Sequence, residues 1–138
     1  MSNFIRFSLL FSLVAGLGLA GCVPDDDEEA TPHHEGLTGN WRLVHRQCYC
    51  VPGPPPNETA TFTATDYTFF KNAQPVSSGT YSVASVKTCG IPTPASGLRF
   101  VDATLGPREA IITLRGDSLV LDYGGPCDHP VDTYLRLP

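Results

Sequence analysis

The sequence predicts an all-β domain over residues 37–138, an antiparallel up-and-down barrel of eight strands. From residue 39 onward, short runs rich in Thr, Tyr, Phe and Val alternate apolar with polar residues, and Gly, Pro and Asp separate the runs. No window has apolar residues at helical spacing over the length of a helix. Short connections between consecutive strands favour a meander, and eight such strands can close and leave no exposed edge. A two-sheet β-sandwich is the alternative, because periodicity does not report whether a sheet closes.

The eight predicted strands follow one another with short connections between most of them. They span residues 40–50, 58–65, 67–71, 78–86, 98–104, 109–115, 118–123 and 131–137. A two-residue turn at residues 116–117 would join the sixth and seventh strands. It pairs Leu114 with Leu119 and Ile112 with Leu121. One face of this hairpin is then wholly apolar and the other mostly polar, as expected for a sheet with one buried face.

The hairpin between the second and third strands sorts its residues in the same way. A turn at residues 65–66 would pair Ala64 with Tyr67 and Phe62 with Phe69. Threonines then occupy the opposite face. Two hairpins that place their large apolar residues on one side indicate a common interior.

The first 21 residues have the features of a secretion signal. A single cation, Arg6, precedes an uncharged apolar run over residues 7–19, followed by small residues. This run is too short to span a bilayer in the finished protein. Residues 19–22, Leu-Ala-Gly-Cys, resemble the bacterial lipobox, which implies cleavage before Cys22 and a membrane anchor of acyl chains on that cysteine. An ordinary secretion signal with a coincidental cysteine is the alternative.

Residues 22–36 are expected to form a disordered tether. Six of the 14 acidic residues of the chain fall there, whereas residues 37–138 hold eight acidic and eight basic residues and are formally neutral. Like charges with few apolar groups do not fold. An acidic run after a lipidated cysteine resembles the surface-export signal of some bacterial lipoproteins, and a solvated spacer is the plainer interpretation. We therefore expect an outer-membrane lipoprotein that faces the periplasm or the cell surface.

Four further cysteines, Cys48, Cys50, Cys89 and Cys127, are expected to form two disulfides in an oxidising compartment. In a strand, Cys48 and Cys50 would point to the same face about 6.6 Å apart, which makes them poor partners for each other. Each is therefore predicted to pair with one of the other two. The alternative is a zinc or copper site made of Cys48, Cys50, Cys127 and His129, although no tight Cys-x-x-Cys pair supports it and no metal is expected.

A family resemblance follows from three segments. The motif LTGNWRLV at residues 37–44 resembles the Gly-x-Trp first strand of lipocalins. The later segments SGTYSV and DTYLRL fall where lipocalin-like bacterial lipoproteins have a strand motif and the last strand. The resemblance implies that Gly39 and Trp41 close one end of the barrel, with Arg136 packed across the Trp41 ring.

The predicted interior offers candidate contacts for a ligand. Pairing and alternation place nine residues there: Leu43, His45, Phe62, Phe69, Tyr81, Phe100, Ile112, Leu114 and Leu121. His45 would supply a polar contact. The same residues serve equally well as a packed core, because an eight-stranded barrel is just wide enough to be filled by side chains or to hold one small ligand.

Two functions are therefore open for this domain. One is the binding of a small hydrophobic molecule inside a membrane-anchored barrel. The other is an inhibitor-like module with a filled barrel that binds a protein partner through loops such as residues 51–57 and 123–130. No nucleophile elbow, zinc-protease motif, phosphate loop or dinucleotide fingerprint occurs, so neither an enzyme nor a cofactor is expected. Balanced charge with scattered bases argues against nucleic acid.

Overall fold

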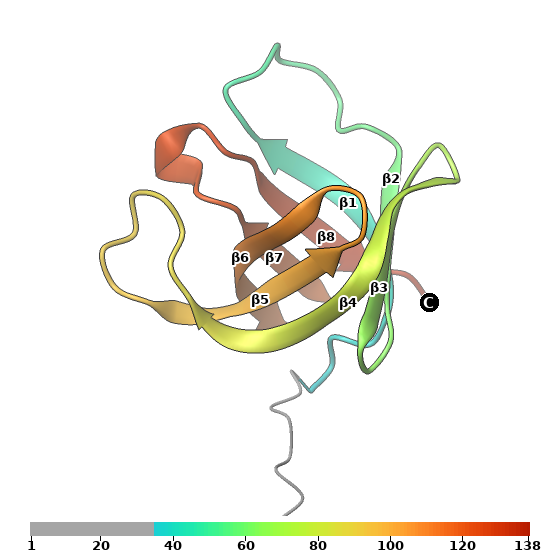
Figure 1. Cartoon of the computed structure of the whole chain (residues 1–138). Helices are drawn as coiled ribbons and strands as arrows, with labels where there is room; N and C mark the ends of the chain where they lie inside the picture. Colours follow the sequence, from blue (N-terminus) through green and yellow to red (C-terminus); the bar gives the residue numbers. More distant parts are fainter. Residues whose placement is uncertain (1–34) are drawn as a thin grey trace, which may run out of the picture.

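A computed structural model describes residues 35–138, which form one closed antiparallel barrel in which each strand pairs with the next (Figure 1). The elements are β1 (Gly39–Gln47), β2 (Glu58–Phe62), β3 (Asp66–Lys71), β4 (Gln74–Val86), β5 (Ala95–Asp102), β6 (Gly106–Arg115), β7 (Ser118–Asp122), the 3-10 turn η1 (Gly125–Cys127) and β8 (Val131–Arg136). Because β8 pairs back onto β1, the barrel prediction is confirmed and the sandwich alternative is wrong. The predicted secretion signal, Cys22 and the tether up to residue 34 lie outside the described residues.

The strand limits differ from the predicted ones mainly at the ends. The first strand stops at Gln47 and the second at Phe62, three residues earlier than predicted in each case. The fourth, fifth and sixth strands begin three or four residues earlier than their apolar runs do, at Gln74, Ala95 and Gly106. Within residues 35–138, no helix has the length and hydrophobicity needed to cross a membrane.

The two predicted hairpins had different outcomes. In the hairpin of β6 and β7, Leu114 pairs with Leu119 and Ile112 with Leu121, as predicted. In the hairpin of β2 and β3 the predicted register is wrong by two residues, since Phe62 pairs with Tyr67 and not with Phe69. A shift of two leaves every side chain on its predicted face, so Phe62 still points into the core.

Local hydrogen bonds explain the shifted register. The Thr63 hydroxyl accepts hydrogen bonds from the backbone N–H of Asp66 at 2.9 Å and of Thr65 at 3.3 Å. The Thr63 N–H in turn donates to the Asp66 carbonyl at 2.9 Å. A threonine hydroxyl that bonds nearby backbone in this way ends the ladder and forms a three-residue connection.

Trp41, which is fully buried, closes the end of the barrel at which β1 begins. Its indole N–H donates to the Leu37 carbonyl at 2.9 Å, and the Arg136 guanidinium lies 4.2 Å from the ring centroid, the contact that the lipocalin resemblance implied. Arg136 also donates to the carbonyls of Thr38, at 2.9 Å, and Gly36. Gly39 has a φ of +140°, and a Cβ there would lie 2.6 Å from Arg136 Nη1, so this position favours glycine.

The disulfide prediction is wrong in its pairing. Cys48 bonds Cys50, with Cα atoms 5.2 Å apart, and Cys89 bonds Cys127, with Cα atoms 5.8 Å apart. The same-face geometry does not apply, because β1 ends at Gln47 and the chain bends at Cys50. The second disulfide ties the β4–β5 loop to η1.

The metal alternative is also wrong, since the two disulfides leave none of its three cysteines as a thiolate. No group of three or more His, Cys, Asp and Glu side chains in residues 35–138 is arranged to hold a metal ion.

Candidate ligand cavity

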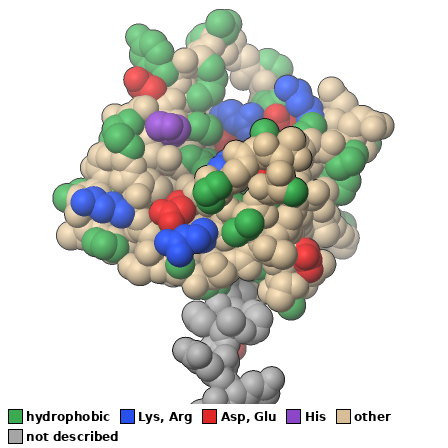
Figure 2. Space-filling view, in the orientation of Figure 1, with side chains coloured by type: hydrophobic (Ala, Val, Ile, Leu, Met, Phe, Trp, Pro, Cys, Tyr) green, Lys and Arg blue, Asp and Glu red, His purple; other side chains and the backbone are tan. Residues whose placement is uncertain are grey.

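A cavity of about 560 Å³ occupies the end of the barrel opposite Trp41. Its wall comes from the end of β1, the starts of β2, β4, β6 and β8, the end of β3 and the loops around them. The lining residues are Arg46, Cys48, Glu58, Phe69, Val76, Ser77, Leu105, Arg108, Tyr123, His129, Pro130, Asp132 and Tyr134. Figure 2 shows this end of the molecule hollowed, with Lys or Arg side chains at the opening.

Two β-bulges shape the cavity wall. In β1 the register with β8 shifts between Leu43 and His45, which leaves Val44 as the extra residue. In β4 the register with β3 shifts where Phe69 and Phe70 pair with Ser77 and Pro75. A bulge bends its strand and redirects the following side chains, and bulges occur often beside functional sites.

The bulge at Val44 overturns one site prediction. Alternation from Trp41 and Leu43 predicted His45 inside the barrel, but its side chain is exposed. The extra residue reverses the alternation, so that Arg46 points into the cavity instead. The polar group that sequence alternation placed at His45 is therefore an arginine, Arg46.

Most of the other predicted ligand contacts belong to the packed core below the cavity. Only Phe69 of the nine lines the cavity wall. Five are buried in the core and two are half-buried against it; the five are Leu43, Phe62, Phe100, Ile112 and Leu121, and the two are Tyr81 and Leu114. For these seven residues the packed-core alternative holds and the cavity-lining one does not, because the closed half of the barrel is filled.

Aromatic rings form the boundary between the core and the cavity. The Tyr67 and Phe100 rings meet edge to face with centroids 4.9 Å apart, and Phe69 lies 5.9 Å from Phe100. Phe69 and Tyr134 are 6.4 Å apart, as are Phe100 and Tyr123. These separations are typical of attractive ring pairs. Burial raises the pKa of both Tyr123 and Tyr134, so both phenols are neutral at physiological pH.

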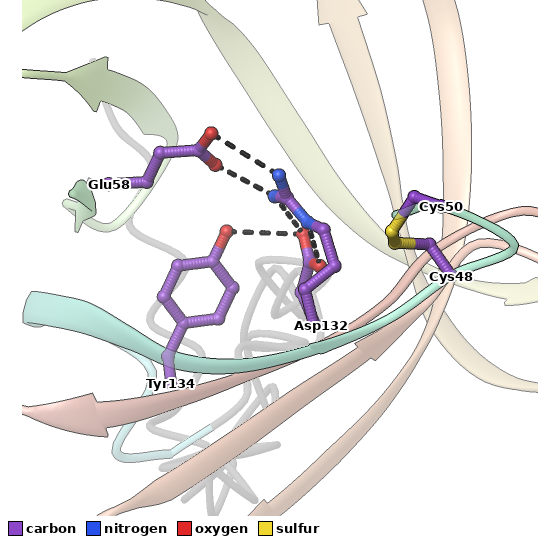
Figure 3. Close-up of polar contacts among 6 residues, drawn as sticks. Cys48, Cys50, Glu58, Asp132 and Tyr134 are labelled. Atoms are coloured by element: carbon purple, nitrogen blue, oxygen red, sulfur yellow. Dashed lines mark hydrogen bonds and ion pairs between the residues drawn. A yellow bond between two sulfur atoms is a disulfide. The ribbon is translucent and has the colours of Figure 1, made fainter. Parts of the chain in front are cut away.

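Arg46 is held in the cavity wall by two carboxylates (Figure 3). Its Nε and Nη2 donate to Asp132 at 2.6 and 2.8 Å, and its Nη2 and Nη1 donate to Glu58 at 2.7 and 3.2 Å. The Tyr134 hydroxyl adds a 3.5 Å hydrogen bond to Asp132. Hydrogen bonding to Asp132, and then to Glu58, outweighs desolvation and raises the pKa of Arg46. We call Arg46, Glu58 and Asp132 the Arg46 triad; it joins β1, β2 and β8.

Arg108 is the second cation of the cavity, and its surroundings are different. Its Cζ lies 5.6 Å from the Phe69 ring centroid, 5.8 Å from that of Phe100 and 5.9 Å from that of Tyr123. Its Nη2 donates to the Ser77 hydroxyl at 3.0 Å. Its Nε is buried and has no hydrogen-bond partner among residues 35–138. Nor does any carboxylate in that part of the chain form an ion pair with it.

Asp102 lies on the far side of Ser77 from Arg108, and its carboxylate already accepts hydrogen bonds from several donors. It accepts hydrogen bonds from the Ser77 hydroxyl at 2.6 Å, from the Tyr67 hydroxyl at 3.2 Å, and from the backbone N–H groups of Thr104 and Leu105 at 2.7 and 2.9 Å. The hydrogen bond from Ser77 and the two from the backbone lower its pKa. Asp102 is therefore ionised and fixes the β5–β6 turn at the cavity opening.

Exposed apolar side chains lie on the loops and strand ends around the cavity, which we call the rim. Tyr49 and Val51, in the β1–β2 loop, are 92% and 91% exposed. Val76, near the start of β4, and Leu105, in the β5–β6 connection, are more than half exposed. Figure 1 shows the β1–β2 loop, the β3–β4 turn and η1 at the same upper end of the barrel. The Cys48–Cys50 disulfide is part of this rim, because Cys48 lines the cavity (Figure 3).

The charged residues of the cavity were missed for identifiable reasons. Strict alternation from Trp41 and Leu43 puts Arg46 on the outer face, because one inserted residue in β1 cannot be seen in an alternating pattern. Asp132 therefore had no visible cationic partner. Arg108 lay just outside the predicted sixth strand, yet it alternates in phase with the buried Ala110 and Ile112, and extending that alternation by two residues would have found it.

No protein-family model, no curated protein and no solved structure matches this chain. The structural class of this protein is therefore defined by its fold and its cavity alone. It is a closed eight-stranded antiparallel barrel, filled at one end and hollow at the other, with two arginines in the hollow.

Proposed function

We propose that this protein is a membrane-anchored, lipocalin-like binding protein that holds one small, predominantly apolar molecule in its cavity. The cavity of about 560 Å³ with its aromatic wall carries this conclusion. Ligand sites measure roughly 300 to 1,000 Å³ and combine an apolar lining with a few placed polar groups. We expect neither catalysis nor nucleic-acid binding, and we expect Cys22 to carry the lipid anchor at the outer membrane.

The test uses the mature chain with Cys22→Ser, exported behind an ordinary cleavable secretion signal, so that it carries no acyl chains. N-phenyl-1-naphthylamine, an uncharged probe whose fluorescence rises in apolar surroundings, is titrated into it. We expect saturable binding of one probe molecule per chain. Absence of saturable binding would overturn the proposed function.

A matched pair of variants locates the probe. Val76 lines the cavity and is 54% exposed, whereas Val101 on β5 is 53% exposed and does not line it. Val76→Trp should narrow the opening and weaken probe binding about tenfold or more, the effect of losing on the order of 1.4 kcal/mol. Val101→Trp adds the same side chain at an equally exposed site and should change binding less than about twofold.

A second candidate function is protein interaction through the rim, favoured by the almost complete exposure of Tyr49 and Val51. Large aromatic and aliphatic side chains on a proline-rich loop lose little entropy when they bind a partner. The double variant Tyr49→Ser, Val51→Ser would abolish capture of a protein partner and leave probe uptake unchanged. If the wild type captures no partner from an envelope extract, this second function fails.

A further inference from the structure

Resting on the proposed function, we infer that the ligand carries a single anionic group on an apolar body, and that Arg108 binds this group. The structure assigns the role to Arg108 because its hydrogen-bonding capacity is largely unused. A guanidinium has five N–H donors and is always charged in proteins. Arg108 makes one hydrogen bond, to Ser77, and its buried Nε makes none within residues 35–138.

Arg46 provides an internal comparison, because it lies in the same cavity and is satisfied. Two carboxylates, Glu58 and Asp132, take four of its hydrogen bonds at 2.6 to 3.2 Å. An added anion near Arg46 would meet these two negative charges. The same cavity therefore holds one arginine that the protein has already paired and one that it has not.

Asp102 does not form an ion pair with Arg108. Ser77 stands between them, accepting from Arg108 and donating to Asp102. The Asp102 carboxylate is satisfied by Ser77, Tyr67 and two backbone N–H groups. This series of hydrogen bonds orients the Arg108 guanidinium and leaves its remaining N–H donors for a ligand.

The surroundings of Arg108 also define the rest of the ligand. Phe69, Phe100 and Tyr123 lie within 5.9 Å of its Cζ and hold the guanidinium by cation–π contact. An anion bound there would lie beside aromatic faces and not in bulk water. A hydrated inorganic ion gains little from such surroundings, whereas an acid with an apolar body places each part against a matching surface.

Two probes that differ by one charged group test this inference. N-phenyl-1-naphthylamine is neutral, and 1-anilinonaphthalene-8-sulfonate adds one sulfonate to the same rings. In the Arg108→Met variant, affinity for the sulfonate probe should fall about tenfold or more, as expected for a lost charged hydrogen bond, while affinity for the neutral probe changes less than about twofold. Arg108→Lys keeps the charge and should retain part of the preference for the sulfonate.

Arg99→Met is the matched control, since Arg99 is half exposed on β5 and pairs with Glu109 outside the cavity. It should leave the binding of both probes unchanged. Near-ultraviolet circular dichroism checks that each variant is folded, and Arg108→Gln provides the same comparison if Arg108→Met is not. If Arg108 variants weaken both probes equally, or neither, the inference is overturned and the proposed function stands. If the wild type binds neither probe, the proposed function itself fails.

Discussion

The Arg46 triad predicts a large loss of stability when its cation is removed. Arg46→Met replaces the guanidinium with an apolar side chain and leaves two carboxylates without their partner. The Asp132 side chain is 4% exposed and that of Glu58 is 17% exposed, so water cannot replace the lost hydrogen bonds at Asp132. Breaking a buried pair by removing one member costs about 3 to 5 kcal/mol. We expect about 3 kcal/mol here, because Glu58 is partly solvated.

Equilibrium urea unfolding with the disulfides intact measures this loss. With a denaturant slope of roughly 1 to 3 kcal/mol per molar urea for a small protein, the midpoint should fall by about 1 to 3 M. The triple variant Arg46→Met, Glu58→Gln, Asp132→Asn removes all three charges together. It should recover most of the loss, because replacing a whole buried ionic group is often close to neutral. A loss below about 1 kcal/mol for Arg46→Met at neutral pH would refute the assigned role of Arg46.

Three further predictions follow from other parts of the barrel. Gly39→Ala should lower the melting temperature by roughly 10 °C in a thermal scan, because a Cβ at positive φ against Arg136 costs about 2 kcal/mol of stability. An unchanged melting temperature would contradict this. Burial holds Tyr123 and Tyr134 protonated, so above pH about 10 the native protein should show less tyrosinate absorbance than the urea-unfolded protein, and its stability should fall as pH rises further. Replacing Cys89 and Cys127 with Ser opens a disulfide of sequence separation 38 and should cost about 3 to 4 kcal/mol in urea unfolding, whereas a loss below about 1 kcal/mol would show that the β4–β5 loop and η1 stay together without the bond.

The sequence predicted the barrel because its large apolar residues keep one parity along each strand. The predicted face of each side chain stays correct when the register is wrong by two residues, as it was between Phe62 and Phe69. An error of one residue puts the following side chains on the wrong face, as the extra residue Val44 does in β1. The interior of the closed half was therefore predictable, whereas the residues beyond the bulge were assigned to the wrong face.

The disulfides failed for a related reason. The prediction assumed that Cys48 and Cys50 belong to a strand, and their pairing depends on where β1 ends. Pattern reasoning is weakest at element ends, because the hydrogen bonds that stop a strand come from loops and neighbouring strands. The cavity lies at such ends, so most of its lining was out of reach of the sequence pattern.

The two ends of the barrel differ in packing: one is filled by side chains and the other holds the cavity. At one end Trp41, Arg136 and Gly39 pack without a cavity, and this is the end where the described chain begins, since Gly36 contacts Arg136 there. The opposite end holds the cavity and is open. At that open end β-bulges bring Arg46 and Ser77 to the cavity wall, where the Arg46 triad stabilises the opening and Ser77 orients Arg108. An arginine held by rings and a hydroxyl, with an unpartnered Nε, is arranged for a group that the chain does not itself supply.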